Sequence, residues 1–178
     1  MAVSSPDLAK REEARALLER QRRQGHDANV AGGAVGQEQL AWLRRELTVA
    51  AAAEDRAVVF SYAPLSAALA RQGDPALVCW NHKEVLAALL EHPGLVPLCL
   101  SGQQLLGGRA CDDRAARGEG RIHHVGLRAV LATPDGGRPG ATLALFRDRV
   151  ELSGAVSATF PCHAPQRGAG ARAAGGGL

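Results

Sequence analysis

Two segments of the chain carry apolar residues at helical spacing. Residues 37–53 have four apolar positions at intervals of three and four: Leu40, Leu43, Leu47 and Ala51. Residues 82–92 have a second such set: Val85, Leu86, Leu89 and Leu90. This periodicity predicts two amphipathic helices, each of which buries its apolar face. Pro93 and Gly94 should end the second helix, and Trp42 lies off the first stripe, at its edge.

Short apolar runs lie on either side of the second helix and predict strands. Residues 57–61 are typical of a buried strand. Residues 95–100 form another run, in which Pro97 indicates an edge position or an irregular start. Because strand, helix and strand follow one another, we expect a βαβ unit whose two strands pair in parallel.

The pattern changes after Gly108. Four short runs there predict antiparallel strands: 122–127, 129–133, 141–146 and 150–153. A turn is predicted at 135–137, and a tight hairpin at Arg147 and Asp148. The chain is therefore expected to be an α/β protein with an α+β tendency, with one βαβ unit, antiparallel strands and an exposed sheet edge.

The two ends of the chain differ from this middle part. Ser5 as N-cap and Pro6 at the first helical position predict a helix that runs to about Gln24, with most of its surface in water. From Gly154 onward Gly, Ala, Pro and Arg dominate, so a disordered tail is expected. The predicted divisions are 1–35, N-terminal helix and loop; 36–153, the folded domain; and 154–178, the tail.

Composition narrows the class of protein. The 178 residues include 21 basic and 18 acidic ones, and only 3% are aromatic. This balance, without basic residues interleaved with aromatic ones, argues against a nucleic-acid partner. The four cysteines include no CxxC pair, which is typical of a reduced, intracellular protein. The charged N-terminal run predicts neither a secretory signal nor a membrane span, so we expect a cytoplasmic protein.

Several local patterns have ordinary structural interpretations. Cys79 and His82 have zinc-like spacing, but no second pair accompanies them. The glycines before residue 37 lack the Lys, Ser or Thr of a phosphate-binding loop. Adjacent His123 and His124 on a strand should place one ring in the core and the other in solvent. Trp80 is expected to pack in the core or against a loop.

The order of several motifs resembles that of the calcineurin-like metallophosphoesterases. Within that superfamily the chain is similar to the C-terminal half of the manganese-dependent ADP-ribose/CDP-alcohol diphosphatases. The motifs that carry the resemblance extend over residues 30–153: 36–43, the strand at Phe60, Trp80-Asn81, 122–125, 133–134 and 140–149. No single one of them is specific; their order is.

The resemblance implies a fold and a metal site. The fold is a four-layer one, a β-sandwich flanked by helices, of which this chain would form a part. The site would hold Mn²⁺ or another divalent pair, whose bridging hydroxide attacks phosphorus. Family ligands in this half are a His after the Phe-Ser strand and a Gly-His-x-His loop, whereas this sequence has Tyr62, Gln103 and Leu105 at those three positions. The ligand set is therefore degenerate, and we expect the chain not to bind the metal.

Two functional hypotheses follow. The resemblance implies a hydrolase of ADP-ribose and of CDP-alcohols such as CDP-choline, CDP-ethanolamine and CDP-glycerol, here truncated and catalytically impaired. The alternative is a non-catalytic pseudoenzyme that binds nucleotides or, through the exposed edge of the Phe60 strand, a protein partner. On the substrate side the resemblance indicates four residues: Trp80, Asn81, His123 and His124. Its implied ligands are nucleotide diphosphates, with neither nucleic acid nor membrane as partner.

Overall fold

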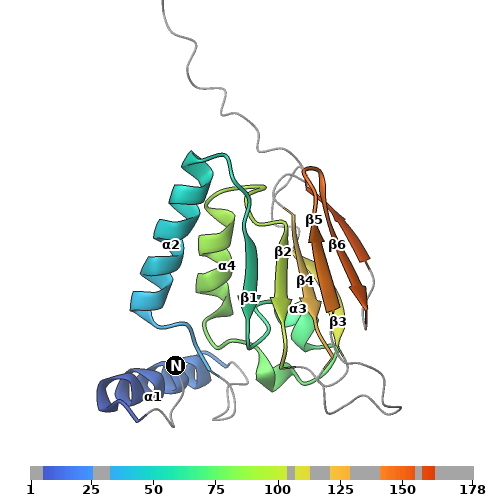
Figure 1. Cartoon of the computed structure of the whole chain (residues 1–178). Coiled ribbons are helices and arrows are strands. Elements are labelled where there is room, and N and C mark those ends of the chain that lie inside the picture. The colour runs from blue at the N-terminus through green and yellow to red at the C-terminus, as the bar shows by residue number, and fades with distance from the viewer. Residues whose placement is uncertain are drawn as a thin grey trace, which may run out of the picture.

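A four-stranded sheet lies between a layer of helices and a second, three-stranded sheet (Figure 1). The computed structural model describes residues 6–25, 33–103, 107–112, 121–128, 141–154 and 158–162. The helices are α1 (Leu8–Arg23), α2 (Gln37–Ala52), α3 (Ala67–Ala70) and α4 (His82–Leu90), with a 3₁₀ turn at Pro75–Leu77. The strands are β1 (Val58–Ser61), β2 (Leu98–Ser101), β3 (Gly108–Asp112), β4 (Ile122–Gly126), β5 (Ala141–Leu145), β6 (Arg149–Gly154) and β7 (Ala158–Pro161).

The predicted βαβ unit is present as β1, α4 and β2. Val58 pairs with Leu98 and Ser61 with Ser101, in parallel. Of the two alternatives for Pro97, the edge position is wrong, because β2 is fully buried between β1 and β4; the strand begins at Leu98, directly after Pro97. The edge strands of the sheet are β1 and β3. Phe60 on β1 is 68% exposed, so the expectation of a buried strand at 57–61 is also wrong.

The strand predicted at 122–127 is present as β4, but its expected antiparallel pairing holds on one side only. It pairs in parallel with β2 and antiparallel with β3. Strand β3 was not predicted, because Gly108, Ala110 and Asp112 give it no apolar face. The amide side chain of Gln72, just after α3, bonds both the backbone N–H and the carbonyl of Arg109. A tertiary contact thus supports a strand that the local sequence does not indicate.

The second sheet has the order β5-β6-β7 and is antiparallel throughout. The hairpin predicted at Arg147 and Asp148 joins β5 to β6, and the N–H of Phe146 donates to the carbonyl of Arg149 (2.9 Å). The prediction that structure ends at Gly154 is wrong for 158–161, because β7 buries Phe160 in the core between the sheets. The predicted strand 129–133, the turn 135–137 and the chain after Cys162 lie outside the described residues.

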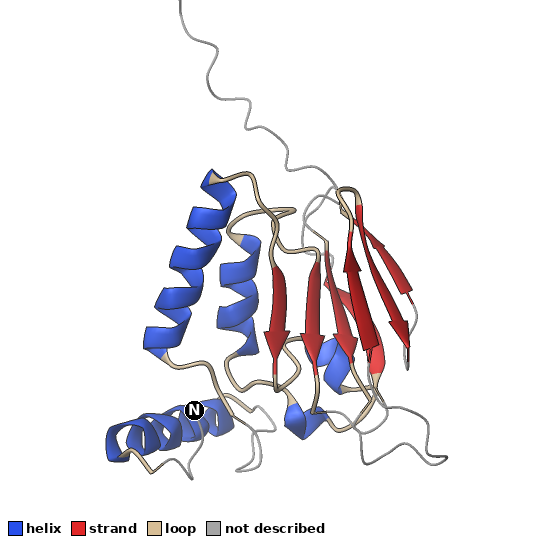
Figure 2. Ribbon diagram, viewed as in Figure 1, coloured by secondary structure: helices blue, strands red, loops and turns tan. Residues whose placement is uncertain are grey.

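The helices and the two sheets form layers (Figure 2), and an apolar core fills each of the two spaces between them. One lies between α2, α4 and the first sheet, and includes the apolar faces predicted for both helices, such as Leu40, Leu47, Val85 and Leu89. The other lies between the two sheets and includes Leu98, Leu100, Val125 and Phe160. Trp42 is half exposed at the edge of α2, as its place off the stripe predicted.

Helix α1 packs at one end of these layers through a small third cluster. Ala14 and Leu18 are its buried apolar residues, and they pack with Ala34 and Trp80. Its N-cap is Asp7, whose side chain accepts from the N–H of Lys10 (3.2 Å), and not the predicted Ser5, which lies outside the described residues. The described helices are all too short or too polar to cross a membrane.

Candidate functional site

The positions that the resemblance assigns to metal ligands meet at the carboxyl ends of two parallel strands. Tyr62 follows β1, and Gln103 lies two residues after the end of β2. The backbone N–H groups of Gly102 and Gln103 both donate to the carbonyl of Tyr62 (3.3 and 3.1 Å). The phenol of Tyr62 points into solvent, with the residue 77% exposed. Leu105 lies outside the described residues.

The side chains at this edge do not fit a divalent metal pair. Ser61 donates its hydroxyl to the carbonyl of Ala63 (2.8 Å), and the buried hydroxyl of Ser101 has no hydrogen-bond partner among the described residues. The groups available as metal ligands are thus a phenol, an amide and two hydroxyls, whereas manganese and iron sites use imidazole and carboxylate ligands. Within the described ranges, no group of three or more His, Cys, Asp or Glu residues is placed to hold a metal ion.

Asn81 connects α4 to the segment before α2. It is 2% exposed. Its Oδ1 accepts from the N–H of Val35 (3.0 Å), and its Nδ2 donates to the carbonyl of Val35 (2.8 Å) and to Oε2 of Glu84 (3.3 Å). Its neighbour Trp80 is 3% exposed and packs in the third cluster. The expected packing role of Trp80 is therefore confirmed, and the substrate-side role of both residues stays a prediction.

The two adjacent histidines point to opposite faces of β4. His124 is 1% exposed, and its Nε2 lies 3.0 Å from Oδ2 of Asp112 without the alignment of a hydrogen bond. This is the ring expected in the core. His123 was expected in solvent, but it is half-buried, with its ring 5.0 Å from that of Phe160. The reason is β7, which the sequence did not predict and which covers that face.

Two buried cysteines, Cys79 and Cys99, have thiols that are hard to ionise. Burial raises the pKa of the Cys99 thiol, and the nearby charge of Asp112 raises it further. Burial also raises the pKa of Cys79, although hydrogen bonds with Val35 and Asn81 act in the opposite direction. All four cysteines are free. Because the thiolate is the reactive form, neither Cys79 nor Cys99 is suited to nucleophilic catalysis.

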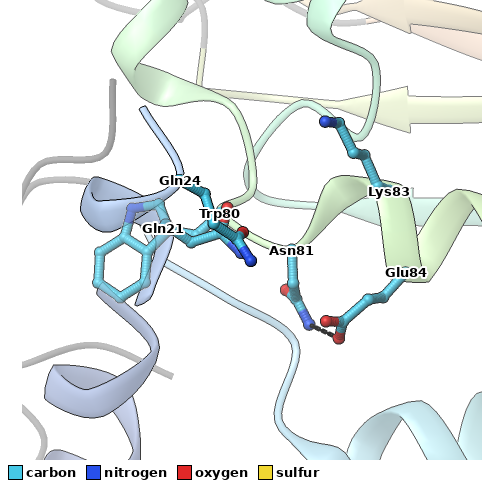
Figure 3. A pocket seen from close by; sticks show the side chains of 6 residues that line it. All are labelled: Gln21, Gln24, Trp80, Asn81, Lys83 and Glu84. Carbon is cyan, nitrogen blue, oxygen red and sulfur yellow. Dashed lines mark hydrogen bonds between the residues drawn. The ribbon is translucent and has the colours of Figure 1, made fainter. Parts of the chain in front are cut away.

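A hollow of about 480 Å³ lies between the last turn of α1 and the first turn of α4 (Figure 3). Its walls are mainly polar, and six residues line it: Gln21, Gln24, Trp80, Asn81, Lys83 and Glu84. The sequence alone does not reveal this hollow, because the two helices approach each other only in the folded protein. A lysine in the first turn of a helix, where positive charge is unfavourable, was the one available signal.

The chain is similar to known proteins over part of its length. No family model matches the chain. The structure is similar to a solved dimetal phosphatase from Danio rerio, with a TM-score of 0.62 and 29% sequence identity over 72% of this chain and 38% of that one. The described residues thus have part of the dimetal phosphatase fold.

Curated relatives carry the more particular name "Manganese-dependent ADP-ribose/CDP-alcohol diphosphatase". The protein from Danio rerio is 32% identical over 123 residues, which are 68% of this chain and 35% of the relative. Those from Xenopus tropicalis and Arabidopsis thaliana are 31% and 30% identical over 122 residues, or 33% and 36% of their lengths. The resemblance predicted from the motif order is therefore confirmed, and the chain spans about a third of the length of these relatives.

Proposed function

We propose that this chain is a catalytically impaired relative of the diphosphatases. By itself it does not hydrolyse ADP-ribose or CDP-alcohols, but it keeps affinity for such nucleotides. The observation that carries the proposal is the pair of side chains at the ends of β1 and β2, where Tyr62 and Gln103 occupy the positions at which the resemblance implies imidazoles.

The chemistry of these side chains supports the loss of activity. The phenol of Tyr62 is a poor substitute for the imidazole and carboxylate ligands of such metal sites. A carboxamide oxygen is a weak, neutral donor, and the leucine at position 105 has no donor atom. Without a metal pair, no hydroxide is activated for attack on phosphorus and no cation stabilises the phosphoryl oxygens.

The test is a hydrolysis assay on the purified 178-residue chain, shown to be folded by circular dichroism. ADP-ribose and CDP-choline are supplied with Mn²⁺, and the Danio rerio relative serves as positive control in the same buffer. We expect the relative to turn over and this chain to show no manganese-dependent turnover and no Mn²⁺ uptake in equilibrium dialysis. Turnover by this chain that a chelator abolishes would mean that other side chains rebuild the site, and the proposal would be wrong.

A second candidate function is that of a protein-interaction module. One observation favours it: β1 is an edge strand of the first sheet, and among the described strands it pairs on one side only. Free backbone groups beside the exposed Phe60 are the usual basis for strand addition by another chain.

A further inference from the structure

The hollow between α1 and α4 lies where α/β proteins commonly bind ligands. Helix α4 returns antiparallel to the strands, so its first turn lies at the carboxyl edge of the sheet. Figure 1 shows α1, the start of α4 and the arrowheads of β1 and β2 at this same end. Ligands of open α/β sheets bind outside the carboxyl ends of the strands. The volume of about 480 Å³ also lies within the usual range for small-molecule sites.

Two polar side chains at this hollow have hydrogen-bonding capacity to spare. Gln21 is 6% exposed as a residue, makes no side-chain hydrogen bond with the residues that the structure describes, and keeps its amide atoms accessible at the hollow. Figure 3 shows Gln21 and Gln24 extending from α1 toward the turn that carries Trp80 and Asn81. The Nε1 of Trp80, which also lines the hollow, is buried without a hydrogen-bond partner among the described residues, which is uncommon in folded proteins. Gln21 is therefore placed to bond a molecule inside the hollow.

The charges around the hollow favour an anion. Lys83, in the first turn of α4, forms no ion pair within the described part of the chain. The acid next to it, Glu84, is already neutralised by Arg20 at 2.9 Å. The N-terminus of α4 adds partial positive charge, so an anionic group would meet a free cation and a helix dipole together.

We propose that this hollow binds a small organic phosphate. The phosphate group lies at Lys83 and the first turn of α4, and the polar organic part lies against the amides of Gln21 and Gln24. Volume selects an organic phosphate over the bare ion, because a single phosphate group would leave most of the hollow empty. The inference rests on the nucleotide affinity proposed above and gives that affinity a location away from Tyr62 and Gln103.

The experiment uses Trp80 as an internal reporter. The sequence has two tryptophans, so Trp42→Phe leaves Trp80 alone beside the hollow. The full chain with this substitution is titrated with AMP, CMP, adenosine and inorganic phosphate, with fluorescence and calorimetry as readouts and no metal added. We expect AMP or CMP to change the emission of Trp80 and to bind more tightly than adenosine or inorganic phosphate.

Two substitutions then locate the site. Lys83→Gln removes the free cation, and Gln24→Glu adds a negative charge of the same shape at an exposed position. Lys83→Gln removes a charge-assisted hydrogen bond, and Gln24→Glu places a negative charge beside an anionic ligand, so each should weaken AMP binding by roughly tenfold. The matched controls are Lys10→Gln, the other lysine, at the far end of α1, and Gln39→Glu on the surface of α2. Both should bind as the parent does.

Each outcome decides something different. Equal binding by all four variants would overturn the location and leave the proposed nucleotide affinity standing. No binding of any phosphate by the folded chain would overturn both. Inorganic phosphate binding as tightly as AMP would show that the organic part is not recognised. None of these results depends on hydrolysis, so the metal-site proposal is tested separately.

Discussion

At the scale of single residues, two pairs of polar groups in the interior show how a side chain can serve packing. Asn81 binds both backbone groups of Val35 and so fixes the entry to α2. His124 and Asp112 bring an imidazole and a carboxylate together beneath the helices. A residue that looks like a site residue in the sequence can therefore have a structural role instead. Its neighbours in the folded protein, more than its residue type, decide whether its role is functional or structural.

Cys99 should resist modification in the folded protein. Its raised pKa keeps the thiol protonated near neutral pH, and the side chain is buried in the central strand. We expect iodoacetamide at pH 8 to label Cys111, which is half-buried on β3, well before Cys99. Peptide mass spectrometry of native and urea-unfolded samples measures this order. Labelling of Cys99 at the unfolded rate would show that the helices do not cover β2.

At the scale of elements, predictability follows the strength of the local pattern. Helices α2 and α4 bury long apolar stripes, and both were found from the sequence. The unit β1-α4-β2 followed from their order. In contrast, β7 has a single large apolar side chain, Phe160, and β3 is held by Gln72 from outside the strand. Such strands depend on partners distant in sequence, and the local hydrophobic periodicity does not indicate those contacts.

The candidate sites show the same limit. The sequence placed Tyr62 and Gln103 correctly at strand ends, because a βαβ unit brings successive carboxyl ends to one edge. The hollow could not be predicted, because Gln21 and Lys83 lie on two helices, α1 and α4, that approach each other only in the folded protein. Periodicity indicates which face of a helix is buried, but not which other element buries it.

Helix α1 should depend on Trp80 for its position. The indole packs with Ala14 and Leu18, and the exposed Arg20–Glu84 ion pair adds little. Trp80→Leu removes much of this contact and leaves a cavity. Hydrogen exchange in α1 should then accelerate by roughly tenfold or more, while β2 and β4 stay protected.

The matched control for this experiment is Trp42→Leu on the exposed side of α2, which should leave exchange in α1 unchanged. Mass spectrometry of peptides from each element supplies the readout. Uniformly faster exchange in all elements would instead mean that Trp80 supports the whole core, and the local role would be rejected.

At the scale of the whole molecule, the two sheets cover each other unevenly. Strands β2 and β4 are buried between the helices and the second sheet, whereas β1 lies at the margin with Phe60 exposed. On the neighbouring sheet Leu145 and Phe146 are exposed as well. Arg56, before β1, donates to the carbonyl of Arg147 (3.0 Å), so the β5–β6 turn lies close to the start of this edge.

This edge should promote association. If the chain uses β1 as an interaction strand, the wild type should show a mass above that of the monomer that rises with concentration in light scattering. Phe60→Lys places a charge on the edge and should return the protein to monomer. Trp42→Lys, at another exposed aromatic residue, serves as the control and should not. A wild type that is monomeric at every concentration would contradict the interaction role for copies of this chain.

The parallel pairing of β1 also sets the order in which the chain can fold. Val58 pairs with Leu98, and Leu98 in turn pairs with His123, so the first sheet joins residues far apart in the sequence. Closing such long loops costs entropy before any contact compensates for it, and folding slows accordingly. During synthesis β1 leaves the ribosome well before its only described neighbour. Until β2 follows, both of its edges are open, and a chaperone has its best opportunity to bind there.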